Sequence, residues 1–198
     1  MAKAYWQGKL LGGYAGVKHT AKQIIAEIPD ISKYKLYVEP FCGLGRTAKF
    51  IDPADMVWAD DMARGKMVLN DRSEFAVSYC RKEFPLATVE NMDFMETIDK
   101  YDDKGVFFLL DPVWRKTHYK ESNMAFCDRE VMDYYRQLLE RIETMKGDWF
   151  LLNSADEHES NDIVRNSRWG LKIISSGGKE IFGLPAKTMV CSKLFDPS

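Results

Sequence analysis

The stretch Val106-Phe107-Phe108-Leu109-Leu110-Asp111-Pro112-Val113-Trp114 joins five consecutive apolar residues to an acid and a proline. An unbroken apolar run of this length predicts a strand buried on both faces, as in the interior of a parallel sheet. Asp111 then lies at the carboxyl end of the strand, where open α/β sheets bind their ligands. Pro112 stiffens the turn, and Trp114 adds a flat aromatic surface. These residues suit the capture of a planar ring that bears an amino group, and they equally fit a plain strand end with a core tryptophan.

Further apolar runs alternate with helical patterns along the chain. Strands are predicted at 35–40, at 149–153, and at one of two competing segments, 56–60 or 66–71. Helical spacing covers 21–28, 74–84 and 128–145, with Asp128 as N-cap, and another helix is expected to open at 46–48. An antiparallel pair is predicted at 171–174 and 188–191, around Gly177-Gly178. The alternation predicts a single three-layer α/β domain over residues 1–198.

The composition excludes several classes of protein. The chain has 198 residues, of which 45% are hydrophobic and 29% charged, and its formal net charge is -2, which is ordinary for a globular domain and unlike a strongly basic nucleic-acid binder. Its four cysteines are far apart and form no CxxC pair, which argues against a zinc site or a disulfide scaffold. We find no apolar leader and no run of membrane-spanning length, so the sequence predicts a soluble, cytoplasmic protein without a metal.

A glycine turn follows the predicted strand at 35–40. Gly43-Leu44-Gly45 allows a ligand to approach the backbone closely, and the run from Gly43 to Ala48 satisfies the loose GxGxxG/A fingerprint of dinucleotide-binding proteins. Glu39, just before the turn, would repel a pyrophosphate, whereas it could pair with a cationic ligand. S-adenosylmethionine, with a sulfonium and an ammonium group and no phosphate, is such a ligand. A nicotinamide-dependent oxidoreductase stays open as an alternative, and so does a turn that uses its glycines only for tightness.

Two motifs, in this order, resemble those of the Dam-like adenine-N6 DNA methyltransferases. Residues 37–45, Tyr-Val-Glu-Pro-Phe-Cys-Gly-Leu-Gly, are similar to the family's V-E-P-F-x-G-x-G cofactor motif. Residues 111–114, Asp-Pro-Val-Trp, are similar to its D-P-P-Y catalytic motif. Weaker similarities connect Gly16-Val17-Lys18 with the family's G-G-K segment, Leu69-Asn70-Asp71 with its L-N-D strand end, and Asp93-Phe94 with its D-F pair.

The resemblance implies a fold, a reaction and a set of site residues. The fold is the Rossmann-like methyltransferase fold, with a mostly parallel sheet, an antiparallel end strand and helices on both faces. The reaction is methyl transfer from S-adenosylmethionine to adenine N6 of DNA, with the target base flipped out of its helix. The implied cofactor-binding residues are Lys18, Glu39, Phe41, Gly43, Gly45, Asp71, Asp93 and Phe94. The residues expected to hold the base are Asp111, Pro112 and Trp114, and those expected to contact DNA phosphates are Arg115, Lys116 and Lys120.

The chain also departs from the family pattern. Val113 replaces the second proline of D-P-P-Y, and the short span between Asp71 and Asp93 leaves no room for the family's helical target-recognition insertion. These departures keep a second hypothesis open, a weak or inactive cofactor-binding subunit whose partner protein recognises DNA. Methylation of RNA, of cytosine N4 or of a small molecule remains a further alternative.

Overall fold

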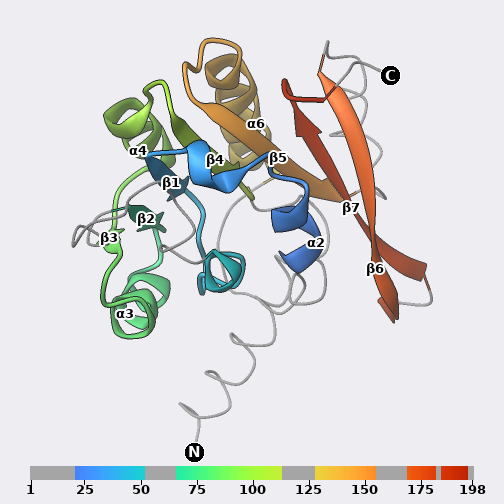
Figure 1. The fold of residues 1–198 in the computed structure, drawn as a ribbon, viewed down its shortest axis with the longest axis horizontal. Coiled ribbons are helices and arrows are strands. Elements are labelled where there is room, and N and C mark those ends of the chain that lie inside the picture. Colours follow the sequence, from blue (N-terminus) through green and yellow to red (C-terminus); the bar gives the residue numbers. More distant parts are fainter. Residues whose placement is uncertain (1–20, 52–65, 113–127, 155–168, 182–183, 196–198) are drawn as a thin grey trace, which may run out of the picture.

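The computed structural model describes residues 21–51, 66–112, 128–154, 169–181 and 184–195, and seven strands of these residues form one sheet (Figure 1). The strands are β1 (Leu36–Glu39), β2 (Met67–Asn70), β3 (Thr88–Glu90), β4 (Val106–Leu110), β5 (Asp148–Ser154), β6 (Gly170–Ile181) and β7 (Leu184–Ser192). The α-helices are α2 (Ala21–Ala26), α3 (Glu74–Glu83), α4 (Phe94–Tyr101) and α6 (Asp128–Ile142), and two short 3₁₀ helices are η2 (Ile31–Lys33) and η3 (Ala48–Phe50).

The strand order is β3-β2-β1-β4-β5-β7-β6. Strands β1 to β5 pair in parallel, and β7 runs antiparallel to both β5 and β6. The chain proceeds from β1 outward to β2 and β3 on one side, and then returns to β4 on the other side of β1. The strand order therefore reverses between β1 and β4, and ligands of open α/β sheets bind outside the carboxyl ends of the strands at such a reversal.

The helices cover both faces of the sheet, with α4 and α6 on one face and α2 and α3 on the other (Figure 1). Side chains alternate along each strand, so β4 sends Phe108 and Leu110 into the core shared with α4 and α6. Its neighbours Phe107 and Leu109 pack into the core shared with α2 and α3. All five residues of β4 are buried, as the unbroken apolar run predicts.

The structure confirms the predicted fold class and several elements. Strands form within 35–40 and 66–71, the strand predicted at 149–153 extends over Asp148–Ser154, and the competing segment 56–60 lies outside the described residues. The helix predicted over 128–145 is present but ends at Ile142 and already includes Asp128. The helix predicted to begin at 46–48 is present only as the short 3₁₀ helix η3, and the described residues end soon after it, at Ile51.

The prediction around Gly177-Gly178 is wrong in one respect. Strands β6 and β7 are antiparallel as expected, but both glycines lie inside β6 rather than in the turn that joins the strands. The pairing continues as far as Ile181 with Leu184. The hairpin is consequently longer than its sequence pattern indicates.

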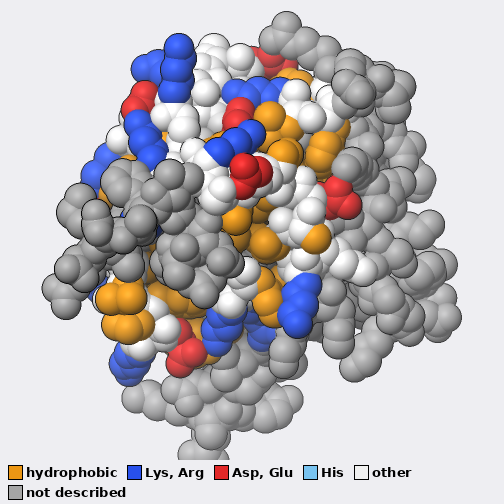
Figure 2. Space-filling view, viewed as in Figure 1, with side chains coloured by type: hydrophobic (Ala, Val, Ile, Leu, Met, Phe, Trp, Pro, Cys, Tyr) orange, Lys and Arg blue, Asp and Glu red, His pale blue; other side chains and the backbone are white. Residues whose placement is uncertain are grey.

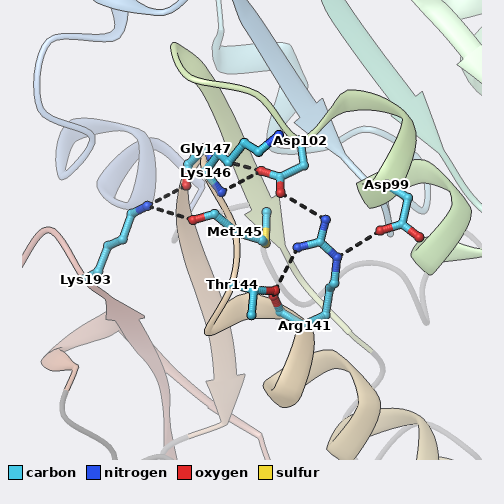
Figure 3. A network of polar contacts seen from close by, with 8 residues as sticks. All are labelled: Asp99, Asp102, Arg141, Thr144, Met145, Lys146, Gly147 and Lys193. Carbon is cyan, nitrogen blue, oxygen red and sulfur yellow. Dashed lines mark hydrogen bonds and ion pairs between the residues drawn. The ribbon is translucent and has the colours of Figure 1, made fainter.

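A polar network closes the amino-terminal edge of the sheet, opposite the edge that carries the predicted site (Figure 3). Arg141 of α6 donates to Asp99 and to Asp102, in each case at 2.9 Å. Asp102 also accepts the backbone N–H groups of Lys146 and Gly147, at 2.9 Å and 3.0 Å. These bonds fix the entry into β5 next to β4. Over the described ranges, we find no helix with the length and apolar character needed to cross a membrane.

Candidate cofactor and substrate site

Glu39 ends β1 and is almost completely buried, with 3% of its surface exposed. Tyr37, two residues earlier on the same face of the strand, donates its phenolic O–H to Glu39 Oε1 at 2.6 Å, and the backbone N–H of Ala48 donates to the same carboxylate. Burial nevertheless raises the pKa of Glu39 to about 8, and the negative charge of Asp111 adds to the rise. A cation placed beside Glu39 would favour its ionised form, so this position suits a positively charged ligand.

Asp111 follows β4 directly, on the other side of the strand reversal. The residue is partly exposed, yet its carboxyl group is deep enough for burial to raise its pKa to about 7. Its charge acts on both Glu39 and Tyr37. The two acids at the ends of β1 and β4 are therefore electrostatic neighbours at the carboxyl edge of the sheet, where the sequence predicts a shared site.

The glycine turn after β1 is held by Asp71. The backbone N–H of Gly43 donates to Asp71 Oδ2 at 2.9 Å, and that of Ser73 donates to Oδ1 at 2.8 Å. Burial raises the pKa of Asp71, and these two bonds oppose the rise. Gly43 and Gly45 have φ values of 51° and 61°, in the left-handed region that favours glycine. Asp71 therefore has a structural role in the turn, besides the cofactor contact that the sequence predicts for it.

Helix α3 packs tightly under the same turn. A Cβ atom added to Gly45 would lie 2.5 Å from the Phe84 ring and 3.5 Å from Cys80 Sγ. The Sγ atoms of Cys42 and Cys80 are 3.8 Å apart, and both thiols are buried. Glycine at 45 is thus required by two independent conditions, its φ angle and the closeness of α3.

Asp93 and Phe94 stand at the start of α4. Asp93 is the N-cap: its Oδ1 accepts the backbone N–H of Met95 at 2.9 Å, and Glu96 completes a capping box. Phe94 is buried and packs against Phe41 and Tyr134, with ring centroids 5.2 Å and 4.5 Å away. The aromatic residues predicted to bind the cofactor therefore do come together.

Two residues of this edge were missed by the sequence reasoning. Tyr134 of α6 joins Phe41 and Phe94 in the aromatic cluster, and its place in the helical pattern gave no sign of it. Asn70, completely buried at the end of β2, donates from Nδ2 to the carbonyl oxygens of Pro40 and Met92, at 3.0 Å and 3.1 Å. Its Oδ1 accepts the N–H of Met92 at 2.9 Å. A polar residue that ends a buried strand was the available signal, because buried amides are almost always hydrogen-bonded.

The remaining predicted site residues cannot be placed in the same way. Pro112 is buried directly after Asp111. The others lie outside the described residues: Lys18, Trp114, Arg115, Lys116 and Lys120. On the face in Figure 2, positive and negative side chains of the described residues are interspersed rather than separated into patches. Among the described residues, no three His, Cys, Asp or Glu side chains are grouped so that they could hold a metal ion.

Comparison with known proteins connects this geometry to a class of fold. No family model matches the chain, and no curated protein matches its sequence. Among solved structures, it is similar to the TehB-like SAM-dependent methyltransferase from Corynebacterium glutamicum, with a TM-score of 0.55, 14% identity, and coverage of 97% of this chain and 96% of that one. It is also similar to the N-methyltransferase NodS from Bradyrhizobium japonicum, with a TM-score of 0.56, 12% identity, and coverage of 91% and 94%.

A third similar structure is an rRNA methylase from Streptococcus thermophilus, with a TM-score of 0.51, 11% identity, and coverage of 88% of this chain and 94% of that one. The three structural similarities extend over nearly the whole chain. Because the sequence identities are low, these similarities show the fold alone. The fold is therefore the Rossmann-like fold of S-adenosylmethionine-dependent methyltransferases, with its antiparallel end strand and its helices on both faces.

Proposed function

We propose that this protein is a methyltransferase that transfers a methyl group from S-adenosylmethionine to adenine N6 of DNA. The observation that carries the proposal is a pair of acids with raised pKa values, the buried Glu39 and the partly exposed Asp111, at the carboxyl ends of the neighbouring strands β1 and β4. One acid suits a cationic cofactor and the other suits an amine that becomes positively charged as it reacts. The sequence resemblance to the Dam-like enzymes supplies the choice of adenine.

The residues around Glu39 fit S-adenosylmethionine chemically. The Glu39 carboxylate would accept hydrogen bonds from the ammonium group of the cofactor, whose positive charge lowers the pKa of the acid. Gly43 and Gly45 would allow a ligand to approach the backbone of the turn closely, and Asp71 retains lone pairs for ribose hydroxyls. The partly exposed Phe41 would offer aromatic surface to an adenine ring, and the buried Phe94 packs against Phe41. When bound, the cofactor supplies an electrophilic methyl group on its sulfonium.

Asp111 would act on the substrate amine. An exocyclic amine conjugated to a purine is a poor nucleophile, and acceptors for its two N–H groups favour the geometry in which its lone pair is free. Asp111 and the carbonyl oxygen of Pro112 are suitable acceptors. Because positive charge develops on the nitrogen during transfer, the Asp111 carboxylate stabilises the transition state more than the ground state. Trp114 would stack on the base, an interaction worth ~1–3 kcal/mol.

The experiment measures methyl incorporation from labelled S-adenosylmethionine into adenine-containing DNA, together with cofactor binding by calorimetry. We expect D111N to lose about 100-fold or more in transfer rate while keeping the cofactor affinity. We expect E39Q to lose about tenfold in cofactor affinity, because a charge-assisted hydrogen bond is removed. The control is D103N, which changes an exposed acid paired with Lys35 at the opposite edge. Equal incorporation by D111N and the wild type would remove Asp111 from the mechanism.

A second candidate function is a cofactor-binding subunit that depends on a protein partner for DNA recognition. It is favoured by Val113 in place of the family's second proline and by the short span between Asp71 and Asp93. Cofactor binding without transfer to DNA, and transfer on addition of the partner, would select this function. Parallel reactions with RNA, with DNA lacking adenine and with small amines test the other acceptors.

A further inference from the structure

Tyr37 carries a polar group in the interior of the molecule. None of its surface is exposed, and its ring is nearly parallel to that of Phe107, with an angle of 5° and 6.2 Å between the centroids. A phenylalanine here would pack in the same way without the cost of removing a hydroxyl from water, so the hydroxyl needs a partner. That partner is Glu39, whose Oε1 accepts the phenolic O–H at 2.6 Å. Such a length is typical of a hydroxyl that donates to an ionised carboxylate.

Tyr37 and Glu39 lie on one face of the sheet, and Asp111 follows on the neighbouring strand. Alternate residues of a strand share a face, and Tyr37 pairs with Phe107 of β4. Leu109, two residues further along β4, belongs to the same core cluster as Tyr37, and Asp111 is the next residue in this alternation. The charge of Asp111 acts on both Tyr37 and Glu39. Tyr37 therefore lies farther from the carboxyl edge than the two acids and bonds directly to Glu39.

Glu39 is held by hydrogen-bond donors from two segments. Besides Tyr37 of β1, the backbone N–H of Ala48 in η3 donates to the carboxylate. An ionised carboxylate has about four acceptor positions, so these two bonds leave about two for a ligand. Among the described residues, the titratable groups that act on Glu39 or respond to its charge are Tyr37, Cys42 and Asp111, and none of them is a cation. A cationic ligand would supply the positive charge that these groups do not provide.

Tyr37 remains a donor throughout the pH range in which the two acids titrate. Burial raises the pKa of Tyr37 well above its ordinary value, and the negative charges of Glu39 and Asp111 raise it further. The phenol consequently keeps its proton, which stays available to the carboxylate. This hydrogen bond lowers the pKa of Glu39, against the larger rise caused by burial. The same O–H group thus orients the carboxylate and favours its ionised form.

We propose that Tyr37 is a positioning residue, which holds the Glu39 carboxylate in its ionised form as the acceptor for the ammonium group of the cofactor. The proposal deepens the proposed function and rests on it for the identity of the ligand. Tyr37 has no exposed surface, so it acts through Glu39 and not on the ligand itself. Its action concerns the cofactor side of the site and is the same for any methyl acceptor.

The first test follows Glu39 in the protein without ligand. The protein is labelled with carbon-13 at the glutamate carboxyl groups and titrated by NMR, and the signal that is missing in E39Q identifies Glu39. We expect its titration midpoint to rise by about one pH unit in Y37F, because the ionised form loses a charge-assisted hydrogen bond.

The matched control for Y37F is Y34F. Tyr34 is also buried, its ring also packs against Phe107, and its hydroxyl donates to Asp148 Oδ2 at 2.8 Å, at the amino edge of the sheet. Y34F therefore removes an equivalent hydroxyl far along the strand direction from Glu39, and we expect it to leave the Glu39 midpoint unchanged. An unchanged midpoint in Y37F, or an equal shift in Y34F, would overturn the proposal.

The second test measures binding by calorimetry with two ligands. One is S-adenosylmethionine, and the other is methylthioadenosine, which keeps the adenosine and the sulfur but lacks the ammonium group. Near pH ~7 we expect Y37F to lose about tenfold in affinity for S-adenosylmethionine, and to lose less above pH ~9, where Glu39 is ionised in both proteins. Methylthioadenosine should bind to Y37F as it does to the wild type. Equal losses for the two ligands would show a merely structural effect and overturn the proposal.

A double variant separates the two residues. In the E39Q background, Y37F should have little further effect on affinity for S-adenosylmethionine, because the ionisable group on which Tyr37 acts is gone. If Y37F does not fold, 3-fluorotyrosine at position 37 takes its place. Its more acidic phenol donates a stronger hydrogen bond, so the Glu39 midpoint should fall, and an unchanged midpoint would overturn the proposal.

These measurements distinguish failure of this inference from failure of the proposed function. A raised Glu39 midpoint and weakened cofactor binding in Y37F, together with a wild type that transfers no methyl group to DNA, would support the role of Tyr37 and overturn the proposed function. Methyl transfer to DNA by a Y37F protein whose Glu39 midpoint and cofactor affinity equal those of the wild type would do the reverse. A wild type that does not bind S-adenosylmethionine would overturn both.

Discussion

Glu39 and Asp111 hold carboxyl groups whose pKa values are raised to about 8 and about 7. Both values lie well above those of exposed acids, so the folded protein keeps protons on these groups at a pH where the unfolded chain has released them. The stabilisation associated with these protons is complete below the pKa of an exposed acid. It is lost as the pH rises through about 7 and 8.

We therefore expect the free energy of unfolding to decrease, on the order of 2–4 kcal/mol, when the pH is raised from about 5.5 to about 8.5. Affinity for a cationic cofactor should change in the opposite direction, because binding requires ionised Glu39. Urea unfolding and calorimetry across this range measure the two effects. E39Q should flatten both profiles, and D103N should flatten neither. If the pH profiles of E39Q were the same as those of the wild type, Glu39 would not be the group that causes the pH dependence.

Site residues that belong to a local sequence motif could be predicted. Those whose role depends on contacts between distant parts of the chain could not. The strand-end positions of Glu39 and Asp111 follow from apolar runs that stop at an acid. The bond from the Gly43 N–H to Asp71 does not, because the two residues are 28 positions apart and meet only through the pairing of β1 with β2. The same holds for Tyr134, which reaches Phe94 from α6.

At the scale of elements, the contact between the glycine turn and α3 can be tested by comparing substitutions at two glycines. Gly45 and Gly105 both have positive φ, at 61° and 78°. A methyl group at Gly45 would collide with Phe84 at 2.5 Å, whereas at Gly105 it would meet only the Lys35 side chain, at 3.7 Å. Both substitutions carry backbone strain, and only the first also requires repacking.

We expect G45A to lower the free energy of unfolding by about 2–4 kcal/mol and G105A by about 1–2 kcal/mol, as measured by urea unfolding. G45A should also weaken cofactor binding, since the turn has to move, while G105A should leave it unchanged. If the two variants lost equal stability, the contact with Phe84 would not be the cause.

The elements that escaped prediction are short. Strand β3 has three residues, all half-buried, so it shows neither an apolar run nor a clear alternation. Helix α4 has eight residues, and its best local signal is the capping box formed by Asp93 and Glu96. In β6, the pair Gly177-Gly178 has the composition of a turn but occupies a bulge, because the continuing β7 strand fixes the register beyond it.

At the scale of the whole molecule, the amino edge of the sheet carries the polar network of Arg141 and Asp102, and the carboxyl edge carries the candidate site. The network around Arg141 and Asp102 connects the segments at the amino edge (Figure 3). Only 5% of the Asp102 side chain is exposed. Removing Asp102 would take one carboxylate from Arg141, which keeps Asp99, and would leave the backbone N–H groups of Lys146 and Gly147 without their acceptor. The exposed pair of Arg136 and Asp133 on the same helix lacks this burial, with 66% and 52% of the two side chains exposed.

We expect D102A to cost about 2–4 kcal/mol of unfolding free energy, because three donors packed around a buried carboxylate lose that acceptor. R136A should cost less than about 0.5 kcal/mol, as is usual for exposed ion pairs. Neither variant should change cofactor affinity, because the network lies at the opposite edge. Thermal or urea unfolding, with calorimetry as the second readout, measures the contrast. A D102A protein as stable as R136A would show that the network contributes little.

The sequence pattern predicts the fold class but not the order of the strands. Alternating helices and apolar runs predict a mostly parallel sheet, and the family resemblance implies its antiparallel end strand. The reversal between β1 and β4 requires long-range pairing, which no local pattern encodes. The reach of the hairpin beyond β5 depends likewise on where two strands stop relative to each other.

The amide of Asn70 bonds to the segments that follow β1 and β3, while Asn70 itself precedes the loop after β2. Three connections that could each fluctuate independently are thereby tied into one unit during folding. A ligand that contacts these three described segments would meet backbone that is already joined by hydrogen bonds, so it would lose less entropy of ordering there on binding.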